Sequence, residues 1–264
     1  MAFPRLDSVQ TSRTVIYNIH PIYMAAINIS VFNLATTLTD TQAKQMVTGI
    51  NKLLPTFCSD WNLKPYTTTF VLKNLVNTTK GIKLFFFDDA DTVDALGYHD
   101  IAGPVPYGKV FVRTTTSYGG GIYKSLTTTP SVATVFSHEV FEIVMDLYVN
   151  TWWLGPDWST LWAAEVCDPV QGNLVRVAVG TDTIVFSDWI LPAWSNPNAV
   201  TGPFNHNKNL RAPFTVDLRG YAIQLSSGNI NYVFGSLVPD AKKEMIQRDE
   251  TRGYKANVTP VTPA

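Results

Sequence analysis

Residues 137–146 constrain the fold of this chain more than any other stretch. They read Ser-His-Glu-Val-Phe-Glu-Ile-Val-Met-Asp, and their apolar residues recur with the period of an α-helix. We predict a helix over residues 130–149, with Thr129 as its cap and Pro130 at its first position. At about 100° per residue, one helix face is apolar and the face beside it carries an imidazole and three carboxylates. These polar side chains are His138, Glu139, Glu142 and Asp146.

The spacing on the polar face suits a divalent metal ion. Side chains at i and i+4 lie one turn apart, so His138 and Glu142 can both reach one ion. The pattern matches the His-Glu-x-x-His helix of zinc hydrolases, whose Glu is a general base, except that Glu142 replaces the second His. Zinc accepts a carboxylate ligand, and the harder ligand set also suits manganese, iron or calcium. A buried polar cluster without metal is the alternative interpretation.

A metal held by two helical side chains needs a third protein ligand, with water completing the coordination. Glu165, which lies 23 residues after Glu142, is the candidate. Asp168 lies one helical turn further on and could orient a ligand or replace it. Cys167 is a candidate soft ligand, although its apolar neighbours favour a buried structural thiol. His99 is either a further ligand or substrate contact, or a histidine hydrogen-bonded within a loop.

The composition indicates a globular chain. Of the 264 residues, 45% are apolar and 12% aromatic, enough to bury a sizeable core. The formal net charge is −1 and no basic run occurs, which argues against nucleic acid as a partner. The N-terminal residues lack a signal-peptide pattern, and no apolar run approaches the ~20 residues of a membrane helix, so we expect no membrane insertion. Two cysteines exclude a disulfide scaffold.

Patterning elsewhere predicts an α+β protein. A strand over 23–32 precedes a helix that Thr39 and Gln42 cap and that Pro55 helps to stop. Further strands are expected over 67–72, 82–87, 107–113, 174–179, 183–187 and 221–225, the second of them buried on both faces. The predicted organisation is an N-terminal arm (1–20), an α+β domain (21–170), a β-rich extension packed on it (171–238) and a polar tail (239–264).

The order of the elements before the motif helix resembles the zincin type of metallohydrolase. In zincins a twisted mixed sheet supports the metal-site helix, and the last strand before that helix borders the cleft. By this analogy, residues 108–114 would form the sheet edge, where an extended peptide can add as a further strand.

Several short motifs also occur here in an order that resembles a group of proteins from tailed phages and bacteria. They lie at residues 95–100, 108–112, 137–142, 165–170, 186–194 and 212–221. Plant extracellular proteins of the exordium type have a similar Ser-His-Glu-x-x-Glu and a later Glu-Ile-x-Asp. The resemblance covers residues 93–222, roughly half the chain. It implies a zincin-like metal site at His138, Glu142 and Glu165 with Glu139 as base, and it implies no particular substrate.

Two functions of different classes follow. In the first, the chain is a metal-dependent hydrolase of a peptide-like substrate, and its divalent ion is most readily zinc. The ion activates a water molecule, Glu139 helps to deprotonate it, and the water attacks an amide or ester carbonyl. In the second, it is a structural virion protein of the capsid, neck or tail that keeps the fold without activity. Its partners would then be other virion proteins or copies of itself. Both place the chain in a virion or in the bacterial cytoplasm.

Overall fold

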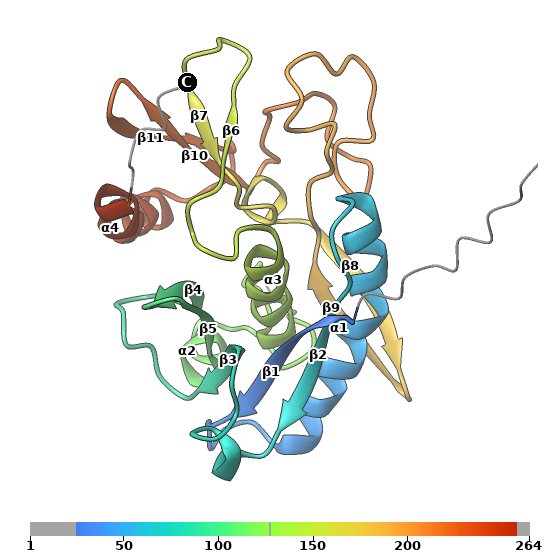
Figure 1. The fold of residues 1–264 in the computed structure, drawn as a ribbon. Coiled ribbons are helices and arrows are strands. Elements are labelled where there is room, and N and C mark those ends of the chain that lie inside the picture. Colours follow the sequence, from blue (N-terminus) through green and yellow to red (C-terminus); the bar gives the residue numbers. More distant parts are fainter. Residues whose placement is uncertain (1–24, 127, 258–264) are drawn as a thin grey trace, which may run out of the picture.

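The structure is a computed structural model that describes residues 25–126 and 128–257. The predicted arm over residues 1–20 lies outside the described residues. The described chain is a mixed α+β protein, which confirms the predicted fold class at this level. Figure 1 shows one sheet with helices beside it in the first half of the chain and β-hairpins in the second half.

The first half is built on a five-stranded sheet in the order β2-β1-β3-β5-β4. Its strands are β1 (Ile27–Asn33), β2 (Tyr66–Val71), β3 (Ile82–Phe87), β4 (Gly97–Ala102) and β5 (Val105–Phe111). Strands β1, β2, β3 and β5 run parallel, and β4 runs antiparallel to β5. The expectation that residues 108–114 form the sheet edge is therefore wrong. A tight turn at Gly103, whose φ is 62°, folds β4 back and makes it the edge strand.

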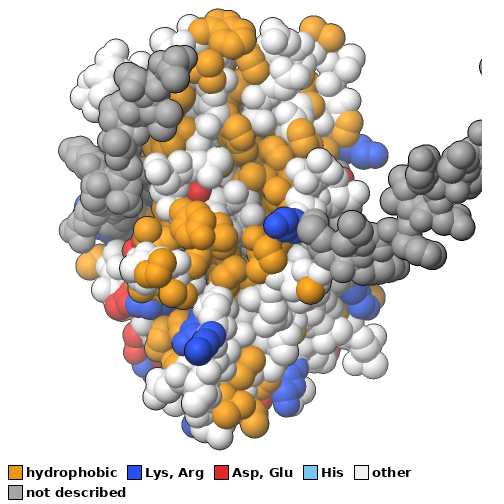
Figure 2. All heavy atoms as spheres, viewed as in Figure 1, with side chains coloured by type: hydrophobic (Ala, Val, Ile, Leu, Met, Phe, Trp, Pro, Cys, Tyr) orange, Lys and Arg blue, Asp and Glu red, His pale blue; other side chains and the backbone are white. Residues whose placement is uncertain are grey.

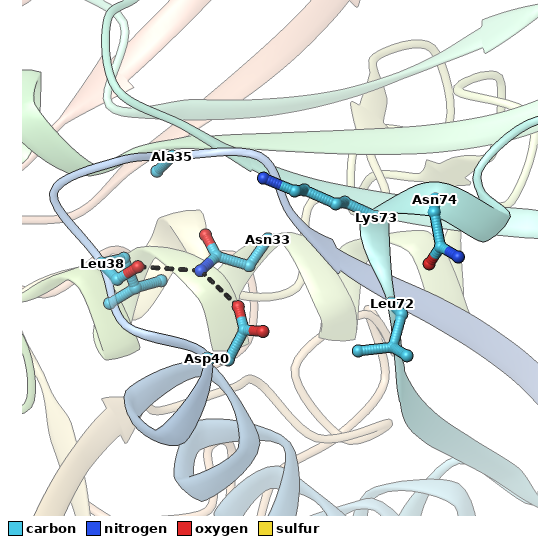
Figure 3. Close-up of a pocket in the computed structure, with 7 residues that line it drawn as sticks. All are labelled: Asn33, Ala35, Leu38, Asp40, Leu72, Lys73 and Asn74. Atoms are coloured by element: carbon cyan, nitrogen blue, oxygen red, sulfur yellow. Dashed lines mark hydrogen bonds between the residues drawn. The ribbon is translucent and has the colours of Figure 1, made fainter.

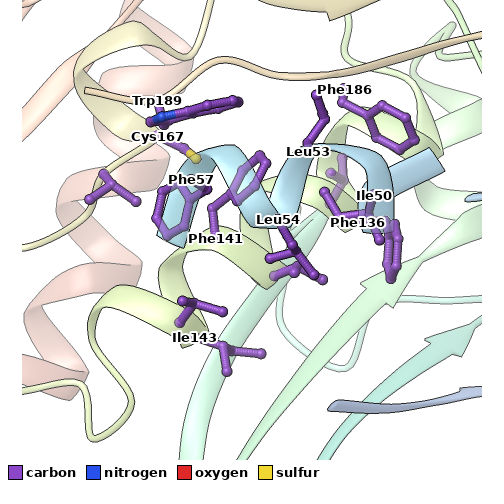
Figure 4. Packing of buried hydrophobic residues seen from close by; sticks show 14 of the residues in the cluster. Ile50, Leu53, Leu54, Phe57, Phe136, Phe141, Ile143, Cys167, Phe186 and Trp189 are labelled. Carbon is purple, nitrogen blue, oxygen red and sulfur yellow. The ribbon is translucent and has the colours of Figure 1, made fainter. Parts of the chain in front are cut away.

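Two helices, α1 (Asp40–Asp60) and α3 (Val132–Met145), pack against one face of this sheet and against each other. Phe86 of β3 contacts Phe136 of α3, and the rings of Phe57 in α1 and Phe141 in α3 stack 4.7 Å apart (Figure 4). Only alternate residues of β3 are buried, so the prediction that this strand is buried on both faces is wrong. Lys83 interrupts the apolar residues of the strand, and Phe85 on the same half-buried face stacks with Phe32.

The start of α1 follows the predicted capping box. The Thr39 hydroxyl accepts from the Gln42 backbone N–H, and the Gln42 side chain accepts from the Thr39 backbone N–H at 2.9 Å. The helix does not stop at Pro55 as expected, but continues to Asp60. A proline removes a single backbone donor, and burial of Phe57 in the next turn favours continued helix.

The second half contains two antiparallel sheets. One has the order β11-β10-β7-β6 and the other is the hairpin β8-β9. Their strands are β6 (Trp152–Leu154), β7 (Leu161–Ala163), β8 (Leu174–Val179), β9 (Asp182–Ser187), β10 (Tyr221–Ser226) and β11 (Asn229–Phe234). The three strands predicted beyond residue 171 are present, whereas β6, β7 and β11 were not predicted. Because β7 pairs with β10, this sheet joins segments from both sides of residue 170.

The remaining helices are short or peripheral. They are α2 (Val112–Ser117), α4 (Asp240–Asn257) and the 3-10 turns η1 (Lys73–Leu75) and η2 (Asp168–Val170). The helix α4 lies in the predicted polar tail, where the charged run from Lys242 to Arg252 suits a short surface helix. Within residues 25–126 and 128–257, no helix has the length and apolar character needed to cross a membrane.

Candidate metal centre

The motif helix α3 is shorter than predicted. Ser131 caps it, since its hydroxyl accepts from the Thr134 N–H at 3.1 Å, whereas the expected cap Thr129 donates to the Tyr118 carbonyl instead. At the other end, the Asp146 carboxylate accepts from the backbone N–H groups of residues 150 and 151. These bonds end the helix at Met145 and hold Asp146 in its C-terminal turn.

Three side chains meet at His138. Its Nε2 atom lies 3.0 Å from Glu142 Oε2 and 3.2 Å from Asp168 Oδ1. The turn η2 positions Asp168, and none of the three side chains is more than 12% exposed. Ligand atoms that share a zinc ion at about 2.0–2.2 Å stand roughly 3–3.6 Å apart, so His138 Nε2 stands at ligand spacing from each of the two carboxylates. Among the described residues, Asp168 is not part of a group whose ligand atoms all lie within 4.8 Å of one another, so it would have to move closer to Glu142 to share an ion with it.

A second group forms around His99, which lies in β4 rather than in a loop. Its Nδ1 atom is 3.5 Å from Glu139 Oε2 and 3.7 Å from Glu142 Oε2, and its Nε2 is 3.8 Å from Glu165 Oε2. The interpretation of His99 as a loop histidine is therefore wrong. Glu165, the third ligand implied by resemblance, contacts His99, and Asp168 is the carboxylate in contact with His138.

Glu139 is held against the edge strand by a close approach. A Cβ atom added to Gly97 of β4 would lie 2.8 Å from Glu139 Oε1 and 2.6 Å from Val135 Cγ1. A glycine at this position therefore leaves room for the carboxylate beside His99, two residues further along the strand. Strand β4 pairs with β5, and both strands contact α3, so β4 and α3 meet at the centre.

Cys167 lies next to His138 and Glu142 and is fully buried. Its backbone N–H donates to Glu142 Oε1 at 3.3 Å, and its sulfur is 3.9 Å from the His138 carbonyl oxygen. Burial raises the pKa of the thiol well above its usual value, and the Glu142 charge adds to the effect. The thiol also lies within 4.8 Å of the ligand atoms of His138 and Glu142, so it stays a candidate soft ligand.

The electrostatics reflect an excess of buried carboxylates. Burial raises the pKa of Glu142 to about 7, although the charge of His138 opposes this shift. The pKa of Glu165 is raised well above its usual range, mainly by burial and next by the charge of Glu142. Burial lowers the pKa of both histidines, but the carboxylates outweigh it. The carboxylates, chiefly Glu165, raise the pKa of His99 to about 10. The carboxylates around His138, chiefly Glu142, raise its pKa well above the usual value. A cation is what such a set of groups would bind in place of protons.

A separate cavity of about 330 Å³ lies where β1 leads into α1 (Figure 3). Asn33 donates there to the Leu38 carbonyl at 2.8 Å and to Asp40 at 3.0 Å. These bonds fix the turn between strand and helix. No residue of the metal centre lines the cavity.

No protein-family model, curated protein or solved structure matches this chain. Functional interpretation therefore rests on the centre itself. Sequence reasoning placed His138, Glu139, Glu142, Glu165 and Asp168 in or near one site, and all five have contacts or charge interactions within it. It left His99 as either a further ligand or substrate contact, or a histidine hydrogen-bonded within a loop. The available signal was the alternation of Gly97 and His99, which places both on one face of a strand.

Proposed function

We propose that this protein binds a divalent metal ion at His138, Glu142 and Asp168 and uses it to hydrolyse amide or ester bonds. The observation that carries the proposal is the convergence of one imidazole and two carboxylates at 3.0 and 3.2 Å in a buried site. Nitrogen and carboxylate oxygen donors suit zinc and also manganese or iron. Buried carboxylates without a compensating charge are unfavourable, which gives the fold a reason to take up a cation.

A zincin-like architecture is part of the proposal. It is supported by the mostly parallel sheet, by the antiparallel edge strand β4 and by the packing of α3 against β4 and β5. The Phe111 N–H donates to the Leu96 carbonyl at 2.8 Å, so Leu96 and Phe111 form a hydrogen-bonded pair at the end of the β4–β5 hairpin. Hydrogen-bonded and non-hydrogen-bonded pairs alternate along an antiparallel ladder, so the backbone N–H and C=O groups of Gly97 and His99 point away from β5. An extended peptide could add to β4 at these positions, beside the centre.

The chain's own residues divide the work of hydrolysis. His138, Glu142 and Asp168 bind the ion, which, when bound, acidifies a water molecule and polarises the scissile carbonyl. Glu139 contacts His99 rather than His138, so it is the carboxylate left to accept the proton of the attacking water. The His99 imidazole lies beside it, with Nδ1 3.5 Å from Glu139 Oε2.

The experiment is metal analysis combined with hydrolysis of a mixed peptide and ester library. His138→Ala should lose the ion and all hydrolysis, whereas Glu244→Gln, an exposed carboxylate change on α4, should lose neither. Hydrolysis of the library by wild type that does not require metal would contradict the proposal.

A structural virion protein that keeps the metal without catalysis is the second candidate. The observation that favours it is the closed centre, in which no side chain is more than 12% exposed. Figure 2 also shows hydrophobic side chains gathered in a band down the middle of one face, with few charged side chains among them. Such a surface suits contact with another protein. A metal-loaded wild type that hydrolyses nothing and assembles with itself or other virion proteins favours this function.

A further inference from the structure

The contacts of His99 have lengths that hydrogen bonds do not have. Its two ring nitrogens stand 3.5 to 3.8 Å from three carboxylate oxygens, whereas N–H···O bonds are about 2.7–3.2 Å long. The side chain is only 8% exposed, and Nε2 has no hydrogen-bond partner among the described residues. A buried imidazole surrounded by carboxylates at these distances has the spacing of ligands around an ion.

The two histidines lie on either side of one carboxylate. Glu142 Oε2 is 3.0 Å from His138 Nε2 and 3.7 Å from His99 Nδ1. Ligand atoms of His99, Glu139 and Glu142 all lie within 4.8 Å of one another, as do those of His138, Glu142 and Cys167. Glu142 is common to both groups, and the contacts to both histidines are made by the same oxygen, Oε2, while Oε1 accepts from the Cys167 backbone N–H. A carboxylate oxygen has two lone pairs with which it can bridge two ions.

The charge of the centre calls for more than one dication. Four buried carboxylates and two histidines lie together, and histidines that bind metal are neutral. One dication would leave two negative charges uncompensated, whereas two dications balance all four. Two further charges cancel in this sum. The buried carboxylate of Asp146 acts on Glu165, and the ammonium of Lys242 acts on Asp168 and donates to Gln171.

We propose that the centre holds two divalent cations bridged by Glu142. His138 and Asp168 complete the first site, and His99 and Glu139 complete the second. Glu165 stands on the far side of the His99 ring and orients it, as carboxylates behind metal-bound histidines do. The inference rests on the proposed function and deepens it. It gives Glu139 a ligand role, so a loss of activity in a Glu139 variant has two explanations that metal content separates.

The test is a titration of chelator-stripped full-length protein with Mn²⁺ alone, read by bound metal per chain and by electron paramagnetic resonance. Wild type should bind two Mn²⁺ per chain, with the six-line signal of isolated Mn²⁺ weakened by coupling between the two ions. His99→Ala and Glu139→Gln should each bind one and restore the six-line signal. Glu244→Gln should bind two.

The outcomes separate this inference from the proposed function. Wild type that binds one Mn²⁺, with the same number in His99→Ala, overturns the second site and leaves the first. If wild type binds one Mn²⁺ and His99→Ala binds none, both histidines share a single ion. That result also overturns two-ion binding. Wild type that binds none contradicts both proposals. If His99→Ala does not fold, the wild-type stoichiometry decides, and His99→Gln with a matching melting curve supplies the second variant.

Discussion

Gly97→Ala tests the close packing of the edge strand on the motif helix. The added Cβ would lie 2.6 Å from Val135 Cγ1, 2.8 Å from Glu139 Oε1 and 2.9 Å from the Lys109 carbonyl oxygen. The last of these is backbone of the paired strand β5 and cannot move aside alone. Overpacking of this kind typically destabilises by about 1–3 kcal/mol, and each kcal/mol lowers the melting temperature of a chain this long by roughly 2–4 °C.

The matched control is Gly49→Ala on α1. Its Cβ would meet the Phe186 ring at 2.5 and 2.6 Å and Val179 Cγ2 at 3.2 Å, and none of these contacts belongs to the metal centre. Both variants are measured by thermal unfolding and by bound metal. We expect both to melt at a lower temperature, and Gly97→Ala alone to lose metal affinity. An unchanged melting temperature for Gly97→Ala would refute the packing of Glu139 against β4.

Three further predictions concern the fold. Thr39→Ala removes the capping box of α1 and should cost about 1 kcal/mol of stability in urea unfolding. Phe141→Ala empties a fully buried site between Phe57 and Trp189, and the same assay should register a loss of about 3–5 kcal/mol. Burial raises the pKa of Asp188 to about 6 in the folded protein, above its unfolded value of about 3.9. Its contribution to stability is therefore complete below about pH 3.9 and is lost as pH rises through about 6, so Asp188→Asn should remove that part of the pH dependence.

Each of these has a contrary result. A Thr39→Ala protein as stable as wild type would mean that the cap does not form. A small loss in Phe141→Ala would mean that the aromatic cluster is loosely packed. Identical stability profiles of wild type and Asp188→Asn between pH 4 and 6 would mean that Asp188 titrates normally in the folded protein.

Local signals in the sequence were sufficient for the elements that depend on neighbours in the chain. The capping box at Thr39 and the strand over residues 82–87 formed where they were predicted, because both depend on spacing within a few residues. The start of α3 was missed by two residues. Thr129 and Ser131 can both cap a helix, and the choice depends on Thr134 bonding to the distant Val185 carbonyl at 3.0 Å.

Features set by long-range pairing could not be predicted. Strand β4 has mixed composition and exists because it pairs with β5, so the sheet edge could not be predicted from the sequence. The alternation of Gly97 and His99 indicates a shared strand face but not that this face packs on α3. Strands β6 and β7 have three residues each, too few for a period, and the buried Trp162 packs on Trp194 from far along the chain. The ligand pair of α3 was predictable because it lies within one helical turn. The contact between Asp168 and His138 depends on how η2 folds back onto that helix.

The central claim is that His138, Glu142 and Asp168 hold a divalent cation. Its most direct test is the metal content of purified wild type and His138→Ala after dialysis without chelator, with the melting temperature of each. The claim predicts at least one divalent ion per wild-type chain, loss of that ion in His138→Ala, and a lower melting temperature that added metal does not restore. Metal-free wild type whose melting temperature is unchanged by added zinc or manganese would contradict it.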